Sequence, residues 1–199
     1  MKQTMEVVTI ILAGGQGTRL HPITMHHSKP AVSYGGRYRL IDVAISNSIN
    51  SKFKKILVIT QYRFEELNDY IKQTYRFDAQ SAGSLDILSP QKDSKGEIQY
   101  YEGTADAIRK NLSTILKSSA DFFLILSGDQ LYNINFQEII SFAKLKDADF
   151  TIASIPVSEK DARRMGLLNI DADNRVIDFI EKPQEAETLH KFALPESFF

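Results

Sequence analysis

A run of β-branched residues that leads directly into a glycine-rich turn limits most strongly what this chain can fold into. The segment Val7–Leu12 reads V-V-T-I-I-L, and a short apolar run bounded by turn residues predicts a buried strand. Gly14, Gly15 and Gly17 follow, and residues without a Cβ let the backbone turn sharply and bring its N–H groups close to a ligand. Arg19 adds a permanently charged planar group that suits phosphate oxygens. The stretch predicts a phosphate-binding loop, with a plain strand-to-helix connection as the alternative.

Two well-known phosphate loops do not match this turn. The P-loop pattern needs a Gly-Lys-Ser/Thr sequence, and none follows the strand. The dinucleotide fingerprint G-x-G-x-x-G starts correctly at Gly15 and Gly17, but Leu20 stands where the third glycine belongs. A nicotinamide dehydrogenase is therefore the weakest of the enzyme classes that this loop suggests.

Composition excludes several classes of partner and site. The 199 residues carry a net charge of -1, so no overall field attracts nucleic acid or an anionic membrane. The absence of cysteine excludes disulfides, thiolate metal sites and cysteine nucleophiles, and it fits a reducing cytoplasm. The first apolar run is too short for a membrane span. Before Asp42 the only acidic residue is Glu6, so the amino-terminal part is locally basic and suits small anions.

Strands and helices alternate along the chain, which predicts an α/β sandwich with a mainly parallel sheet. The expected strands are Val7–Leu12, Lys55–Thr60, Leu85–Leu88, Phe122–Leu126 and Asp149–Ile155, with a hairpin formed by Gly166–Ile170 and Val176–Ile180. The expected helices are Leu40–Asn50, Phe64–Gln73, Gly103–Lys117 and one from Asn135 to Lys144. Their inward residues are expected to be Ile41, Ala44, Ile45 and Ile49, then Leu67, Tyr70 and Ile71, then Ile108, Leu112, Ile115 and Leu116. In such folds ligands bind at the carboxyl ends of the strands.

Several polar residues stand where this arrangement would place a site. Asp129 follows the strand Phe122–Leu126, where a carboxylate and substrate phosphates could hold Mg²⁺; a turn aspartate is the alternative. Gly103 and Thr104 open a helix whose N–H groups favour an anion or a base edge, with an ordinary helix cap as the alternative. Lys29 precedes a proline in a rigid bend close to the glycine loop. None of these signals is specific alone.

Glu181 and Lys182 close the expected hairpin. A carboxylate and an ammonium group there could contact a sugar hydroxyl and a phosphate. A solvated pair of opposite charges is the ordinary state of such residues and is the alternative.

The order of these motifs resembles that of the sugar-1-phosphate nucleotidyltransferases, most closely their ADP-glucose-forming branch. The matching stretches are L-A-G-G-Q-G-T-R-L, S-K-P-A-V, Y-R-L-I-D-V-A-I-S-N-S-I-N-S, V-I-T-Q-Y, Y-E-G-T-A-D-A-I, L-S-G-D-Q-L-Y and F-I-E-K-P. They cover residues 10–183 in the family's order. The glycine loop and E-K-P are shared across the family, whereas Y-R-L-I-D, N-S-I-N-S, I-T-Q-Y and G-T-A-D-A point to the branch.

The resemblance implies a Rossmann-like three-layer catalytic domain with a mainly parallel mixed sheet. It implies a reaction of ATP with glucose 1-phosphate, dependent on Mg²⁺, that gives ADP-glucose and diphosphate for glycogen or starch synthesis. It also implies that this chain is the amino-terminal part of that domain. We then expect a further metal-binding aspartate, a left-handed β-helix domain and a homotetramer in the full-length protein, and low activity of this part alone.

Site residues follow from the resemblance position by position. The catalytic group comprises Arg19, Lys29 and Asp129, of which Asp129 is the metal ligand. The nucleotide-binding group comprises Leu12, Ala13, Gly14, Gly15, Gln61, Tyr101, Gly103 and Thr104. The sugar-phosphate group comprises Tyr101, Gly166, Glu181 and Lys182.

Some positions depart from the family's pattern. His26 and His27 replace a basic pair near the family's effector site, and imidazoles are mostly uncharged near neutral pH. Glu102, Gln130 and Met165 replace an arginine or glutamine, a histidine and an aromatic residue, respectively. These departures leave open the effector, a related enzyme that uses dTTP, CTP or GTP, and a regulatory subunit that binds effectors without catalysis.

Overall fold

The computed structural model of the protein describes residues 5–15, 17–77 and 83–195, apart from the side chain of Arg19. The chain divides between Asp149 and Phe150 into two compact units. Among the described helices, none combines the length and the apolar character needed to cross a bilayer.

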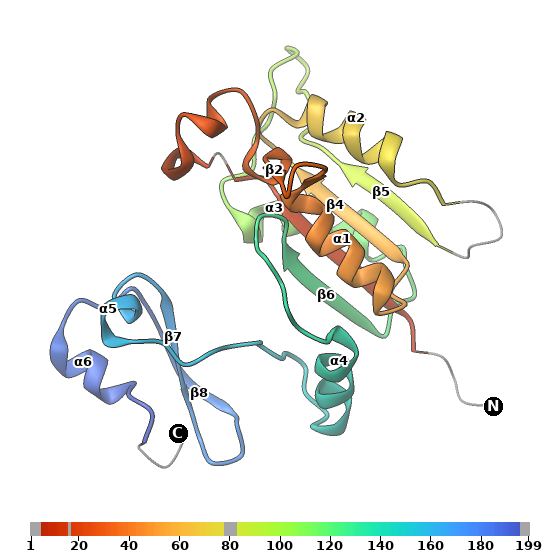
Figure 1. Ribbon diagram of the computed structural model, residues 1–199. Helices are drawn as coiled ribbons and strands as arrows, with labels where there is room; N and C mark the ends of the chain where they lie inside the picture. The colour runs from red at the N-terminus through yellow and green to blue at the C-terminus, as the bar shows by residue number, and fades with distance from the viewer. Residues whose placement is uncertain (1–4, 16, 78–82, 196–199) are drawn as a thin grey trace. The chain divides into compact units, whose positions relative to one another are not determined.

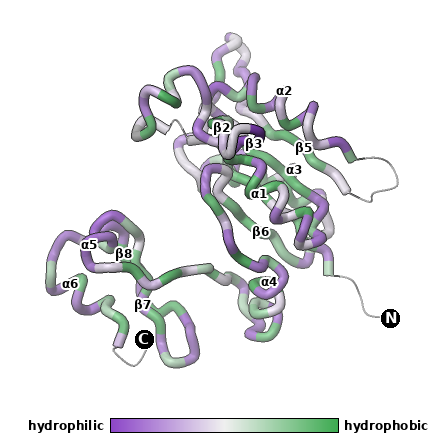
Figure 2. The backbone as a smooth tube through the Cα atoms, viewed as in Figure 1, coloured by the Kyte–Doolittle hydropathy of each residue, from purple (hydrophilic) through white to green (hydrophobic). Residues whose placement is uncertain are grey.

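The first unit is built on a four-stranded parallel sheet in the order β5-β4-β1-β6. The strands are β1 (Val7–Ala13), β4 (Lys55–Thr60), β5 (Ser84–Leu88) and β6 (Phe122–Ser127). Both faces of the sheet are covered, which explains why the strands are nearly continuous hydrophobic runs (Figure 2). The chain adds strands on one side of β1 and then places β6 on the other side, so the strand order reverses next to β1. The predicted parallel α/β architecture is confirmed.

Helices cover the sheet on both faces and complete a three-layer sandwich (Figure 1). On one face lie α1 (Leu40–Asn50), α2 (Phe64–Thr74) and α4 (Phe136–Leu145), and on the other lies α3 (Thr104–Ile115). Adjacent residues of β1 point into the hydrophobic cores on opposite faces of the sheet, because side chains alternate along a strand. Ile11 packs with Ile45 and Leu67, whereas Ile10 packs with Ile59 and Ile115.

The predicted apolar faces are right for two helices and partly wrong for a third. Ile41, Ala44 and Ile45 of α1 are fully buried, as are Leu67 and Ile71 of α2. On α3, however, Leu112 is 43% exposed and Leu116 is 61% exposed. Ile115 is buried and Ile108 packs against the same core, as predicted, and the buried face also includes Ala107. Around the helix, Leu112 and Leu116 lie about 100° and about 140° from the midpoint between Ala107 and Ile115, on the side away from the sheet.

Short elements connect β1 to α1 and project beyond the carboxyl ends of the strands (Figure 1). They are the 3-10 helices η1 (Thr18–Leu20), η2 (Ile23–Met25) and η3 (Lys29–Ala31) and the small antiparallel pair β2 (Ser33–Tyr34) and β3 (Tyr38–Arg39). The helix predicted to start at Asn135 is confirmed as α4. The Asn135 side chain caps it by accepting a hydrogen bond from the backbone N–H of Gln137.

The second unit consists of a hairpin and two short helices. The hairpin strands β7 (Gly166–Ile170) and β8 (Val176–Glu181) pair antiparallel, as predicted. The helices are α5 (Glu159–Ala162) and α6 (Ala186–Lys191). The strand predicted for Asp149–Ile155 is wrong: the segment forms no regular element and pairs with no described strand. A β-branched apolar run becomes a strand only when its N–H and C=O groups find a neighbouring strand.

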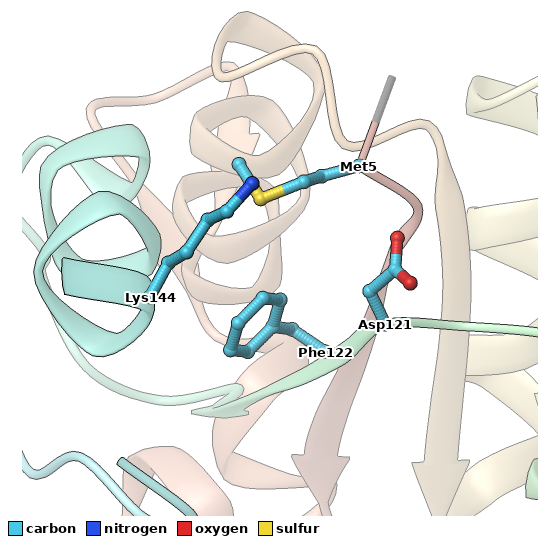
Figure 3. Close-up of a pocket in the computed structure, with 4 residues that line it drawn as sticks. All are labelled: Met5, Asp121, Phe122 and Lys144. Carbon is cyan, nitrogen blue, oxygen red and sulfur yellow. The ribbon is translucent and has the colours of Figure 1, made fainter. Parts of the chain in front are cut away.

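A shallow pocket lies at the amino end of β6 (Figure 3). Met5, Asp121, Phe122 and Lys144 line it. Because β6 is parallel to β1, this pocket lies at the edge of the sheet opposite to the glycine-rich turn. It is therefore separate from the site predicted at the carboxyl ends of the strands.

The buried hydroxyl of Thr9 leads to a stability prediction. Thr9 is fully buried in β1, and its Oγ1 has no hydrogen-bond partner among the described residues. Thr9→Val should raise the free energy of unfolding by about 1 kcal/mol, because it removes an unpaired polar group from the core. Thr60 is a matched control: it is equally buried in β4, but its hydroxyl lies 2.9 Å from the Ser89 hydroxyl. Thr60→Val should therefore lower stability in the same urea titration, and equal shifts in both variants would contradict this interpretation.

Candidate active site

The register of the parallel strands brings the predicted residues to one edge of the sheet. Leu12 in β1 lies level with Ile59 in β4 and Ser127 in β6. Two residues further along the chain, just beyond the ends of these strands, come Gly14, Gln61 and Asp129. The N–H of Gly128 donates to the carbonyl of Leu12 at 2.9 Å, so the chain after β6 stays beside the chain after β1. This is the point where the strand order reverses, the usual position of a ligand site in an open α/β sheet.

The glycine-rich turn leaves open space on one side and packs closely on the other. A Cβ on Gly15 would meet nothing within 4 Å, and the exposed backbone there is free to approach a ligand. Gly17 has a φ of 69°, in the left-handed region that favours glycine. The Thr24 hydroxyl donates to the Gly17 carbonyl at 2.6 Å and holds the turn. Ala13 is buried beneath the turn, and Leu12 packs into the core on the α3 side.

Lys29 and Asp129 form an ion pair at this edge. The Lys29 Nζ lies 2.7 Å from Asp129 Oδ2, and about a quarter of each side chain is exposed (27% and 25%). The other oxygen, Oδ1, accepts a hydrogen bond from the Ser127 hydroxyl at 2.5 Å. Partial burial raises the pKa of Asp129, but the bonds from Lys29 and Ser127 outweigh it and lower the pKa below its usual value. Asp129 therefore stays ionised at neutral pH.

Gln61 and Tyr101 form a closed pair of hydrogen bonds next to Gly14. The Gln61 amide donates to the Tyr101 carbonyl at 3.0 Å and accepts from the Tyr101 N–H at 3.1 Å, and both residues are buried. A Cβ on Gly14 would lie 3.1 Å from the Gln61 Cβ, so a larger residue would crowd this side chain. Asn111 of α3 donates to the Tyr101 hydroxyl at 3.0 Å. The pair fixes the segment that leads into α3.

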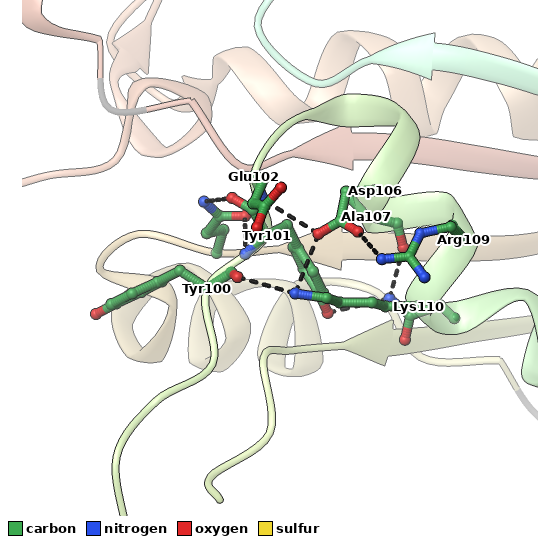
Figure 4. A network of polar contacts seen from close by, with 9 residues as sticks. Tyr100, Tyr101, Glu102, Asp106, Ala107, Arg109 and Lys110 are labelled. Atoms are coloured by element: carbon green, nitrogen blue, oxygen red, sulfur yellow. Dashed lines mark hydrogen bonds and ion pairs between the residues drawn. The ribbon is translucent and has the colours of Figure 1, made fainter.

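The start of α3 carries a network of charges (Figure 4). The Asp106 carboxylate accepts from the Glu102 N–H at 3.1 Å and pairs with Arg109 at 2.5 Å and Lys110 at 3.1 Å. The hydrogen bond from Glu102, followed by the two cations, lowers the pKa of Asp106 to about 2. Gly103 and Thr104 stay exposed at the helix start, near the buried ring of Tyr101. Asp106 thus ties the segment before α3 to its first turn, while the N-cap residue Gly103 makes no side-chain cap hydrogen bond.

His26 and His27, the pair expected near the effector site, differ in their contacts. His27 Nδ1 lies 2.7 Å from Glu66 Oε2 on α2, and Arg39 lies 2.8 Å from the other oxygen of Glu66. Burial raises the pKa of Glu66, but His27 and Arg39 together lower it below its usual value. His26 is exposed. The effector expected near these residues stays a prediction.

The sugar-phosphate residues predicted from E-K-P come together within the second unit. Gly166 and Glu181 are register partners in the β7–β8 hairpin, and Lys182 follows directly. Lys182 Nζ lies 2.7 Å from Glu181 Oε1, and both side chains are more than half exposed (60% and 56%). A Cβ on Gly166 would lie 3.0 Å from Glu181 Oε2. This is the solvated pair that the sequence left as an alternative, with both groups free to meet a ligand.

Sequence reasoning located most of these residues but missed two supporting ones. Ser127 was not singled out, although its place two residues before Asp129 puts it on the same side of an extended chain. Thr24 belongs to no motif, and only the fold brings its hydroxyl to the carbonyl of Gly17. The backbone of Arg19 lies in η1, but its side chain lies outside the described residues.

Comparisons with known proteins agree with this geometry. The family model for nucleotidyl transferases matches residues 8–196. The chain is 39% identical over 186 residues to a glucose-1-phosphate adenylyltransferase of Rhodopirellula baltica, covering 92% of this chain and 41% of the relative. It is 37% identical over 182 residues to a protein of the same name from Trichlorobacter lovleyi, covering 92% of this chain and 44% of the relative. The chain thus spans about two-fifths of the length of these curated relatives. Since the family model matches nearly the whole chain, this protein belongs to the nucleotidyl transferase family.

Proposed function

We propose that this chain carries the nucleotide site of an enzyme that transfers the adenylyl group of ATP to α-D-glucose 1-phosphate. The products would be ADP-glucose, for glycogen or starch synthesis, and diphosphate. The observation that carries the proposal is the ion pair of Lys29 and Asp129 beside the glycine-rich turn, at the reversal of strand order. The names of the two relatives supply the substrates.

The proposed chemistry needs positioning and charge neutralisation rather than a strong base. The sugar phosphate oxygen is already anionic and attacks the α-phosphorus in line, while diphosphate leaves. Backbone N–H groups at Gly14 and Gly15, together with Arg19 and Lys29, would hold the triphosphate. The Gln61–Tyr101 pair would line the adenine pocket with Gly103 and Thr104. Within the second unit, Gly166, Glu181 and Lys182 would bind the sugar phosphate.

The donor set fits Mg²⁺ supplied together with a nucleotide. Among the described residues there is no group of three or more acidic, histidine or cysteine side chains that could hold a metal ion. Mg²⁺ commonly uses one or two carboxylates and completes its shell with water and substrate phosphates. Asp129, ionised and partly exposed, is the carboxylate in this chain that would hold the ion. When bound, the ion would neutralise charge on the phosphates and orient them.

Two further features belong to the same proposal. The lack of cysteine is compatible with a cytoplasmic enzyme. The homotetramer, the second metal-binding aspartate and the β-helix domain implied by the resemblance stay predictions for the full-length protein.

Release of diphosphate from different nucleotides tests the proposal. The full-length protein is mixed with glucose 1-phosphate, Mg²⁺ and either ATP, dTTP, CTP or GTP, and the initial rate of diphosphate release is measured. We expect the highest kcat/KM with ATP. A preference for dTTP, CTP or GTP would assign the protein to a related sugar-1-phosphate nucleotidyltransferase, and no release with any of them would favour a regulatory subunit.

Gly17→Ala is expected to weaken ATP binding about tenfold, because an added Cβ would lie 2.9 Å from the Lys29 Cβ and shift that side chain. The matched control is Gly35→Ala: its φ of 61° resembles the 69° of Gly17, but its Cβ would meet nothing within 4 Å. Both variants carry a similar backbone cost of about 1–2 kcal/mol. Calorimetric titration with ATP should therefore separate them, and equal affinities in the two variants would contradict the role of the turn.

A further inference from the structure

The Lys29–Asp129 pair places an ammonium group on the carboxylate that is proposed to hold the metal ion. Asp129 Oδ2 receives the Lys29 Nζ at 2.7 Å, and Oδ1 receives the Ser127 hydroxyl at 2.5 Å. Both oxygens are therefore engaged before any ligand binds. The ammonium group neutralises a partly buried negative charge.

We infer that Lys29 is the resident counter-ion of Asp129, and that a divalent cation must displace it when the metal–nucleotide complex binds. The inference rests on the proposed function and adds an exchange of partners to it. Asp129 passes from Lys29 to the metal ion, and Lys29 passes from Asp129 to the nucleotide phosphates. Lys29 is thus a positioning residue in the free protein and a phosphate ligand in the complex.

The two cations cannot share the carboxylate without strong repulsion. A Mg²⁺–oxygen bond is about 2.1 Å long, so an ion on Oδ2 would lie no more than about 5 Å from the ammonium nitrogen. A doubly and a singly charged cation at that separation repel each other, most strongly where exposure to water is limited. The ammonium group sits on a flexible four-carbon stem, whereas Asp129 directly follows the sheet. Lys29 is therefore the partner that moves.

The packing of the lysine stem indicates where the ammonium group goes. The Cβ and Cγ of Lys29 lie against the glycine-rich turn, because a Cβ on Gly17 would be 2.9 Å and 3.4 Å from them. Rotation about the outer bonds of the stem moves the charge along this turn while the inner carbons stay packed. The turn is where the triphosphate is proposed to bind, so the displaced ammonium group would meet phosphate oxygens.

The exchange makes the metal site dependent on the nucleotide. Without a nucleotide, a divalent ion has one carboxylate to bind and a lysine to displace, so its affinity is low. With a nucleotide, the phosphates both ligate the ion and accept the lysine. This arrangement keeps a free metal ion from occupying the site in an unproductive way.

Titration of the full chain with Mn²⁺ in the absence of nucleotide tests the exchange, with free Mn²⁺ followed by electron paramagnetic resonance. Lys29→Gln should bind Mn²⁺ about tenfold more tightly than the wild type, since the competing cation is gone. Lys29→Met, which also keeps the inner stem, should give the same gain. Lys29→Arg retains the charge and should keep the low affinity. Lys117→Gln removes a lysine beyond the far end of α3 and is the control for net charge; it should bind like the wild type.

Asp129→Asn separates failure of the exchange from failure of the metal site. If Asp129→Asn loses Mn²⁺ binding and the two neutral Lys29 variants bind no more tightly than the wild type, the exchange is overturned and the metal site stands. If Asp129→Asn binds Mn²⁺ as well as the wild type, Asp129 is not the ligand, and both the exchange and the metal part of the proposed function are wrong. Absence of measurable binding in Lys29→Gln would also overturn the exchange.

Discussion

Asp129→Asn in the full-length protein is expected to lower kcat by about 10²–10³-fold, the usual loss when one charge-stabilising group is removed from an active site. Asparagine keeps the size of the side chain and an oxygen for the Ser127 hydroxyl. It removes the negative charge that binds Lys29 at 2.7 Å and that is proposed to bind the metal ion. The variant should therefore fold normally and lose turnover. Steady-state release of diphosphate measures the effect.

A matched control exists on the same strand. Asp121 immediately precedes β6, at the edge of the sheet opposite to Asp129, and accepts a hydrogen bond from the Glu6 N–H at 2.9 Å. Asp121→Asn makes the same chemical change about 20 Å away, the length of a six-residue strand. Its kcat should stay within about twofold of the wild type. Unchanged turnover in Asp129→Asn would instead mean that catalysis does not depend on Asp129, and its role as the metal ligand would be wrong.

Asp42→Asn is expected to lower the free energy of unfolding by about 2–4 kcal/mol, the largest effect on stability that we predict. Asp42 lies at the start of α1 and is only 4% exposed. Its Oδ2 accepts from the Tyr70 hydroxyl at 2.5 Å and from the Arg39 N–H at 2.7 Å, and its Oδ1 accepts from the Tyr75 hydroxyl at 2.7 Å. An asparagine would turn one acceptor into a donor and face it toward another donor.

Urea unfolding of two variants checks this prediction. Asp69→Asn changes an exposed aspartate of α2 and should alter stability by less than about 0.5 kcal/mol. If Asp42→Asn costs no more than Asp69→Asn, the network that ties α1 to α2 does not stabilise the fold as its geometry indicates.

The pH dependence of the same network follows from Tyr70. Burial, together with the hydrogen bond to Asp42 and its negative charge, raises the pKa of Tyr70 from 10.0 to about 12. A raised pKa favours the protonated donor in the folded state, so this stabilisation is fully present below about pH 10 and is lost as the pH rises through about 12. Absorbance titration of the tyrosines should show a high-pKa class that shifts downward in Asp42→Asn. No shift would contradict the contact.

The sequence predicted the edge of the sheet where the site lies because one simple rule governs it. Parallel strands that end at Ala13 and Ser127 bring the residues after them to the same edge, and the pairing of β1 with β6 makes Gly14 and Asp129 neighbours there. The apolar faces of α1 and α2 could be predicted from the sequence equally well. In both helices the apolar residues recur at helical spacing over the part of the sheet that they cover.

Other features depend on contacts between segments far apart in the sequence. The pairing of Lys29 with Asp129 joins residues 100 positions apart, and no local pattern specifies it. From the sequence, Asp42 is an ordinary acidic residue in the first turn of a helix. Its two tyrosine partners come from α2 and from the residue that follows α2. Leu112 and Asp149–Ile155 were misjudged for a similar reason: apolar periodicity indicates which residues could be buried, but neighbouring segments decide whether they are.

The central claim is that the carboxyl ends of β1 and β6 bind the metal–nucleotide complex, and paramagnetic broadening of backbone amide signals by Mn²⁺ with ATP tests it most directly. The effect falls steeply with distance from the ion. We predict that the signals of Gly15 and Gly128, which come after these two strands, broaden at the lowest Mn²⁺–ATP concentrations. Those of Val7 and Phe122, at the amino ends about 20 Å away, should stay sharp. Broadening of Val7 and Phe122 that matches or exceeds that of Gly15 and Gly128 would contradict the account.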